Sequence, residues 1–139
     1  HRAMDPRIRD AFLASFNRCR ASAGFLEAFY EGFVASSEEI RAKFAGTDMK
    51  RQVRMLEDSL LVIAVAVQGE EGSLARSELP RIAARHSRSD RNIRPELYDL
   101  WLECLIDTVR RHDPQFSAEL EAAWRETLAF GIDYMRARY

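Results

Sequence analysis

Two histidines beyond the first three residues are the side chains best suited to bind a metal or to move a proton. The first ends the stretch LPRIAARHSRSD, in an apolar stripe with the helical spacing i, i+3, i+4 and i+7: Leu79, Ile82, Ala83 and His86. Such a histidine is either a core residue with an ordinary hydrogen bond or a ligand of a group that the sequence does not show. The second, His112, stands among charged residues at the end of a predicted helix, and we expect it to be solvated.

The sequence contains no motif of the common classes of catalytic site. It has no glycine-rich phosphate loop, no HExxH and no Gly-x-Ser-x-Gly. Cys19 and Cys104 have no second ligand at metal-binding spacing, so we expect both to be reduced and structural. The glutamate pairs at 38–39 and 70–71 fall in the first turn of a helix and in a connector, where acidic residues favour the helix dipole or water. We therefore expect no catalytic residue among them.

A glutamine and a tyrosine lie beside apolar faces of predicted helices. Gln52 shares a helical face with Leu56, Leu60 and Ile63, and it is the one polar residue on that face. It is either the rim residue of an amphipathic helix or a buried donor. Tyr30 lies beside a phenylalanine-rich face, and its hydroxyl needs a partner if the ring is buried. Taken singly, each residue is more typical of packing than of function.

Length and composition fit one globular domain. The chain has 139 residues, of which 47% are hydrophobic and 31% charged, and its net charge is −1. This balance gives no support for binding to nucleic acid or to a membrane surface. The apolar run LLVIAVAV at 60–67 is too short to span a bilayer, and no secretory signal is visible, so we expect a cytoplasmic protein. Residues 1–3 have the character of a tag remnant before Met4.

Start and stop signals predict an all-α chain of about seven helices and no strands. The predicted helices span 6–21, 25–35, a short segment that ends near 44, 49–68, 73–87, 95–112 and 118–139. Their predicted N-caps are Asp5, Ser36 in a capping box with Glu39, Thr47 or Asp48, Ser73, and Ser117. Pro80 predicts a kink in the fifth helix.

The ordered set of residues over these helices resembles a bacterial single-domain globin and is similar to the haem domain of flavohaemoglobins. Within FYEGFVASSEEIRAKF, Tyr30 matches the distal tyrosine. Phe44, fourteen residues later, matches the phenylalanine that packs on the haem plane. Gln52 and Leu56 match the distal glutamine and the leucine one turn later. His86, 34 residues after Gln52, matches the proximal iron ligand.

The resemblance implies a globin domain over 4–139 that lacks the fourth helix of vertebrate globins and holds haem b. It makes Ile82, Ile93 and Tyr98 candidate haem contacts, although Tyr98 and Trp101 can equally belong to the core behind the pocket. Arg85 and Arg91 are candidate partners for the haem propionates, with a solvated basic connector as the alternative.

The implied function is reversible binding of dioxygen, and also of NO and CO, at ferrous haem. Tyr30 and Gln52 are both able to donate a hydrogen bond to dioxygen, and about 1–1.5 kcal/mol from each would slow its loss roughly tenfold. Two alternatives remain: a nitric oxide dioxygenase served by a separate reductase, since we expect no flavin domain in this chain, and the gas-sensing domain of a longer protein. A globin-shaped module without haem is disfavoured by His86 together with Tyr30 and Gln52. The expected state is a monomer or homodimer.

Overall fold

The computed structural model describes residues 4–68 and 95–138, and this part of the chain folds into six α-helices with no strand. The helices are α1 (Pro6–Ala21), α2 (Phe25–Ala35), α3 (Glu38–Phe44), α4 (Met49–Gln68), α6 (Pro95–His112) and α7 (Ala118–Arg138). The all-α prediction is confirmed. The helix expected over 73–87, with its kink at Pro80, lies outside the described residues.

Capping side chains fix where the first and fourth helices begin. The Asp5 carboxylate accepts a hydrogen bond from the Arg7 backbone N–H at 2.9 Å, and Pro6 supplies the preset φ of the first helical turn. The Asp48 carboxylate caps α4 by accepting from the N–H groups of Lys50 and Arg51 at 3.1 and 3.3 Å. Of the two caps considered for α4, Asp48 is therefore the one that forms.

The start of α3 differs from the prediction of a cap at Ser36. Ser36 has helical backbone angles, φ −78° and ψ −16°, at the end of α2, and its hydroxyl donates to the Phe33 carbonyl at 2.6 Å. Ser37 is extended, φ −159° and ψ 139°, and its Oγ accepts from the N–H groups of Glu39 and Ile40. Because an N-cap needs non-helical angles, the cap shifts by one residue.

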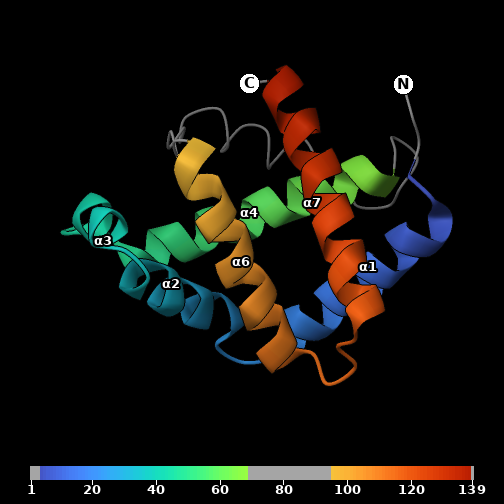
Figure 1. The fold of residues 1–139 in the computed structure, drawn as a ribbon, viewed down its shortest axis with the longest axis horizontal. Helices are drawn as coiled ribbons and strands as arrows, with labels where there is room; N and C mark the ends of the chain where they lie inside the picture. Colours follow the sequence, from blue (N-terminus) through green and yellow to red (C-terminus); the bar gives the residue numbers. More distant parts are fainter. Residues whose placement is uncertain (1–3, 69–94, 139) are drawn as a thin grey trace.

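The helices pack in pairs around one core (Figure 1). α2 lies against α3, α4 and α6, while α7 lies against α1, α4 and α6. In Figure 1, α4 passes behind α6 and α7. The connection between α3 and α4 spans only residues 45–48 and holds no helix. The largest fully buried side chains are Trp124, Phe12, Phe16, Phe29, Phe33, Ile40, Leu60, Ile63, Leu105, Ile106 and Leu128.

Gly131 allows α7 to approach α4 closely. A Cβ at this position would lie 2.5 Å from Cγ1 of Ile63 on α4, closer than two carbon atoms can pack. Any larger side chain would force the two helices apart or displace Ile63. The crossing of α4 and α7 therefore depends on a glycine.

A buried ionic cluster joins α1, α6 and α7, and we call its members Ser15, Arg18, Asp113 and Trp124 the Asp113 cluster. The Asp113 carboxylate accepts from Arg18 Nε at 2.7 Å, from Ser15 Oγ at 2.5 Å and from the Gln115 N–H at 2.9 Å. Ser15 Oγ in turn accepts from Trp124 Nε1 at 2.9 Å. Burial alone would raise the pKa of Asp113, but the hydrogen bonds from Arg18 and Ser15 outweigh it and hold that pKa below its ordinary value.

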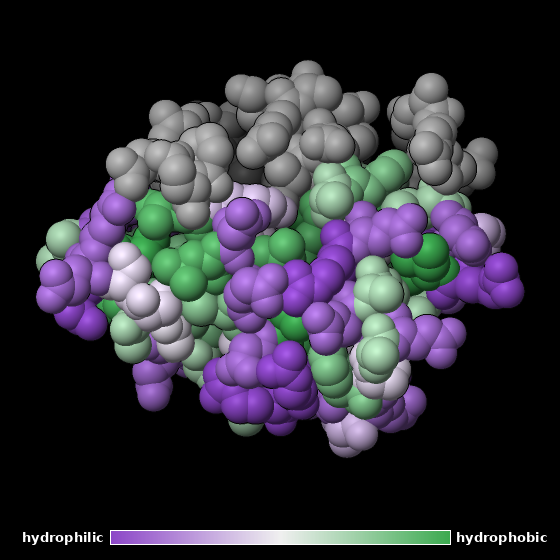
Figure 2. Space-filling view, in the orientation of Figure 1, coloured by the Kyte–Doolittle hydropathy of each residue, from purple (hydrophilic) through white to green (hydrophobic). Residues whose placement is uncertain are grey.

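The outer surface is largely polar. Figure 2 shows hydrophilic residues over much of one face, with hydrophobic residues grouped around the upper half of α6. None of the described helices combines the length and the hydropathy that crossing a bilayer would need.

Candidate functional site

Tyr30 stands in an aromatic cluster formed by α2 and α3. Its ring meets the rings of Phe29 and Phe44 edge to face, with centroids 5.1 and 5.9 Å apart. Phe33 packs on the other side of Phe44, with centroids 6.2 Å apart. Only 8% of Tyr30 is exposed, so its phenol group is held in a largely apolar surround.

Gln52 and Leu56 lie one turn apart near the start of α4, the helix that packs against α2. Gln52 is 3% exposed, which rules out the interpretation of a glutamine at a solvated rim. Its backbone N–H donates to the Asp48 carbonyl at 3.1 Å, so the cap of α4 also fixes the turn that carries the Gln52 side chain. Leu56 is buried as well.

These four residues, Tyr30, Phe44, Gln52 and Leu56, form what we call the distal region. They combine two neutral hydrogen-bond donors with one aromatic and one aliphatic wall. None of the four carries a charge. The arrangement suits a small polar or polarised molecule better than an ion, since burying an ion requires a partner of opposite charge.

Two aromatic residues of α6 extend this packing. Trp101 meets Phe29 edge to face at 6.0 Å, and Tyr98 stacks on Trp101 at 5.6 Å. Trp101 thus packs against the same Phe29 that supports Tyr30. Tyr98 is half-buried at the outer end of this row of rings.

The other half of the expected site is the proximal side of the haem. The residues concerned all lie outside the described residues: Ile82, Arg85, His86, Arg91 and Ile93. Among the described residues, no group of three or more His, Cys, Asp or Glu side chains is arranged to hold a metal ion.

His112, expected to be solvated, is half-buried instead. Its Nδ1 lies 2.8 Å from Ser22 Oγ, and its ring meets that of Phe25 edge to face at 5.7 Å. The prediction was wrong because the end of α6 meets the turn between α1 and α2, a contact that helical periodicity does not reveal.

The two cysteines are free, as expected. Burial raises the pKa of the Cys19 thiol to about 12 and also raises that of Cys104. Both thiols are therefore protonated at neutral pH, which makes them poor nucleophiles.

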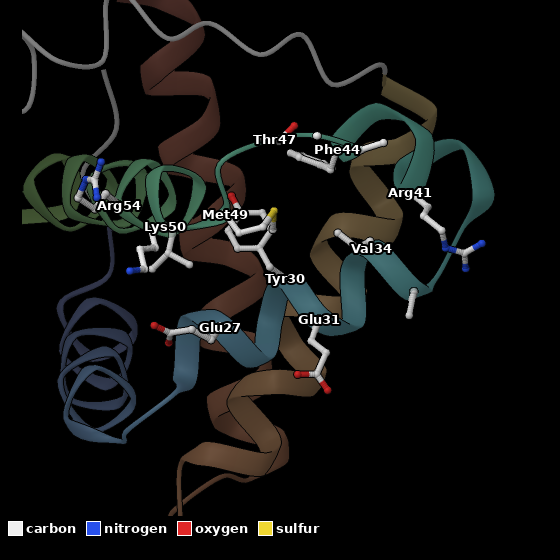
Figure 3. A pocket seen from close by; sticks show the side chains of 14 residues that line it. Glu27, Tyr30, Glu31, Val34, Arg41, Phe44, Thr47, Met49, Lys50 and Arg54 are labelled. Atoms are coloured by element: carbon white, nitrogen blue, oxygen red, sulfur yellow. The ribbon is translucent and has the colours of Figure 1, made fainter.

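A groove that the sequence did not predict runs between α2 and the start of α4 (Figure 3). It encloses about 1010 Å³. Tyr30 and Phe44 line it together with the apolar side chains of Val34, Met49 and Val53. No motif marks this groove, because it arises from the short connection between α3 and α4 rather than from a residue pattern.

Comparison with known proteins agrees with this architecture. The globin family model matches residues 27–135. The chain is also similar to a crystal structure of a protein from Pseudomonas aeruginosa PAO1, described as structurally highly homologous to a human hemoglobin. The sequence identity is 41% and the TM-score 0.72, over 95% of this chain and 98% of that one. No curated protein sequence gives a significant match. The family match and the structural similarity together establish that this chain belongs to the globin family.

Proposed function

We propose that this protein binds haem b and holds dioxygen reversibly, with His86 as the proximal iron ligand and Tyr30 and Gln52 as distal donors. The observation that carries the proposal is the burial of two neutral donors, Tyr30 and Gln52, on helices α2 and α4, which pack together. Phe44 contacts the Tyr30 ring, and Leu56 lies one turn after Gln52. Globins in general carry haem, and the globin family model matches residues 27–135, a range that includes all of these residues.

The distal region fits the chemistry of a haem group. Phe44 offers an aromatic ring to a flat, apolar macrocycle, and Leu56 offers an aliphatic surface. The region also lacks a charged side chain that would have to be neutralised when an apolar group is placed beside it. Haem, when bound, would supply a ferrous iron that can bind a diatomic gas.

Tyr30 and Gln52 would then discriminate between gases by polarity. A phenol and a carboxamide donate more strongly to polarised dioxygen than to carbon monoxide, which carries less charge on its outer atom. The apolar walls exclude water that would compete for the same donors. We expect slow dioxygen release and a smaller effect on carbon monoxide.

The same donors would serve a nitric oxide dioxygenase supported by a separate reductase, or a gas-sensing domain. Steady-state consumption of nitric oxide in the presence of a reductant distinguishes the enzyme from the carrier. Rapid, sustained turnover would favour the enzyme, whereas a single stoichiometric reaction would favour the carrier.

The direct test is the absorption spectrum of the purified protein supplied with haem. We expect a Soret band in the wild type and its loss or a large shift in His86→Ala, because the imidazole ties the iron to the protein. His112→Ala is the matched control, since its ring contacts Ser22 and Phe25 instead. No Soret band in the wild type would refute haem binding, and an unchanged ferrous spectrum in His86→Ala would refute the ligand assignment.

A further inference from the structure

The groove between α2 and α4, which we call the outer groove, has an apolar floor and a charged rim. Its floor includes Val34, Phe44 and Val53. Glu27 and Glu31 line it from α2, whereas Lys50 and Arg54 line it from α4. Figure 3 shows Glu27 on one side of the gap and Lys50 and Arg54 on the other. A neutral diatomic gas meets no charge on such a floor and needs no partner there.

Tyr30 links the outer groove to the distal region. It lines the groove, and it is also the residue that matches the distal donor. Gln52 and Leu56 are not among the residues that line the groove, although Val53, next to Gln52 in the chain, is. A molecule beside Tyr30 in the groove is therefore in contact with one of the two proposed donors.

Met49 lines the outer groove and is in part exposed to solvent. It is the first residue of α4 and is 37% exposed, more than any other large hydrophobic residue whose burial the structure describes. In Figure 3, Tyr30 points from α2 toward the start of α4, where Met49 lies. A methionine side chain is unbranched and has three rotatable bonds, so it narrows a channel without sealing it.

We propose that the outer groove is the path by which diatomic gases reach and leave the haem, and that Met49 is its gate. The inference rests on the proposed function, because it needs haem iron as the destination. It adds a route and a rate-controlling side chain to that function. A gate does not contact the gas once it is bound. It therefore changes the association and dissociation rates by the same factor and leaves the equilibrium affinity unchanged.

Two measurements test the gate: flash photolysis of the carbon monoxide complex gives the association rate, and replacement of bound carbon monoxide by nitric oxide gives the dissociation rate. In Met49→Ala, which shortens the side chain, we expect association and dissociation rates to rise together by about threefold or more. In Met49→Trp, which enlarges the side chain, both rates fall by a similar factor. The matched controls are Met55→Ala and Met55→Trp, on the same helix but outside the groove lining, and they should leave both rates unchanged.

The outcomes separate this inference from the proposed function. Unchanged rates in both Met49 variants, in protein with an intact Soret band, would overturn the path and leave haem binding in place. A change in the dissociation rate alone would also overturn it, since that result indicates a contact with the bound gas. Because Met49 is exposed, both substitutions are compatible with the fold, and a circular dichroism spectrum checks this.

Discussion

Two regions of the molecule bury polar side chains, and they do so by opposite means. In the Asp113 cluster a carboxylate and a guanidinium meet at 2.7 Å, and a hydroxyl and an indole complete the bonding. In the distal region the polar groups are the neutral phenol of Tyr30 and the neutral amide of Gln52. The first region joins α1, α6 and α7, and the second joins α2, α3 and α4.

The difference shows how one core can serve both stability and function. A buried carboxylate is costly unless oppositely charged and polar partners surround it, so the Asp113 cluster is closed and fixes three helices relative to each other. Neutral donors are less costly to bury, so the distal region can border an open groove. We therefore expect substitutions in the first region to change the free energy of unfolding, and those in the second to change ligand kinetics.

The largest expected effect follows removal of the charge at the centre of the Asp113 cluster. Asp113→Ala should lower the free energy of unfolding by about 3 kcal/mol, because it leaves the Arg18 guanidinium and the Ser15 hydroxyl without their acceptor. Chemical denaturation measures the change. Asp107→Ala, on α6 six residues earlier in the chain, removes a carboxylate from exposed ion pairs with Arg110 and Arg111 and should cost less than about 0.5 kcal/mol.

Equal losses in the two variants would contradict the claim that the buried cluster holds the helices together. A large change in carbon monoxide association for Asp113→Ala would contradict the separation of the two regions, because Asp113 lies just after α6 and outside the distal region.

A second contrast compares two glycines in helices. Gly131→Ala should lower the free energy of unfolding by about 1–3 kcal/mol, because the new Cβ would lie 2.5 Å from Cγ1 of Ile63. Gly32→Ala, on α2, meets nothing within 4 Å and should raise it by about 0.5–1 kcal/mol through helix propensity. Thermal denaturation of the two variants gives the comparison, and a stabilised Gly131→Ala would show that α4 and α7 can separate without cost.

The two regions also differ in how well the sequence predicts them. Helical periodicity places Tyr30 and Gln52 beside apolar helical faces, and the burial of both follows from that placement. Their proposed distal role comes from the resemblance to globins, since periodicity alone is equally typical of packing residues. The Asp113 cluster escapes prediction because its partners are distant in the chain: Ser15 and Asp113 are 98 residues apart. In the sequence, a polar residue with a distant partner cannot be told from a solvated one. The burial of His112 against Ser22 and Phe25 went unpredicted for the same reason.

Some features of the backbone were also predicted from the sequence and others were not. Helix bounds follow local signals, so α1, α2 and α4 begin and end as predicted. The cap of α3 shifts from Ser36 to Ser37 because two adjacent serines offer the same side chain, and only the backbone angles decide between them. The outer groove depends on how three helices meet, which no short pattern records.

The distal region gives a kinetic prediction of intermediate size. Tyr30→Phe and Gln52→Leu should each speed dioxygen dissociation roughly tenfold, which corresponds to about 1–1.5 kcal/mol per hydrogen bond. Carbon monoxide dissociation should change less in both variants. Stopped-flow replacement of dioxygen by carbon monoxide measures these rates. If dissociation of both gases stays at the wild-type rate, the donors do not contact the ligand.

The smallest expected effect is the dependence of stability on acid. The pKa of Asp113 is lower in the folded chain than its ordinary value of 3.8, despite burial, because Arg18 and Ser15 stabilise the carboxylate. Its contribution to the free energy of unfolding is therefore complete above about pH 4 and is lost as the pH falls through the folded pKa. The effect is smaller than that of Asp113→Ala, since a protonated carboxyl keeps part of its hydrogen bonding.

Denaturation curves between pH 5 and pH 2.5 (a range set by about one unit on either side of the ordinary pKa) would measure this slope. Asp113→Asn should flatten it, because the amide does not titrate. Glu103→Gln should flatten it much less: a hydrogen bond from Arg125 lowers the pKa of Glu103, but its side chain is 60% exposed, so water screens the pair. If Glu103→Gln removes as much of the slope as Asp113→Asn, then the exposed carboxylate contributes as much to the pH dependence of stability as the buried one. That result would contradict the claim that burial in the Asp113 cluster is what makes Asp113 important for stability.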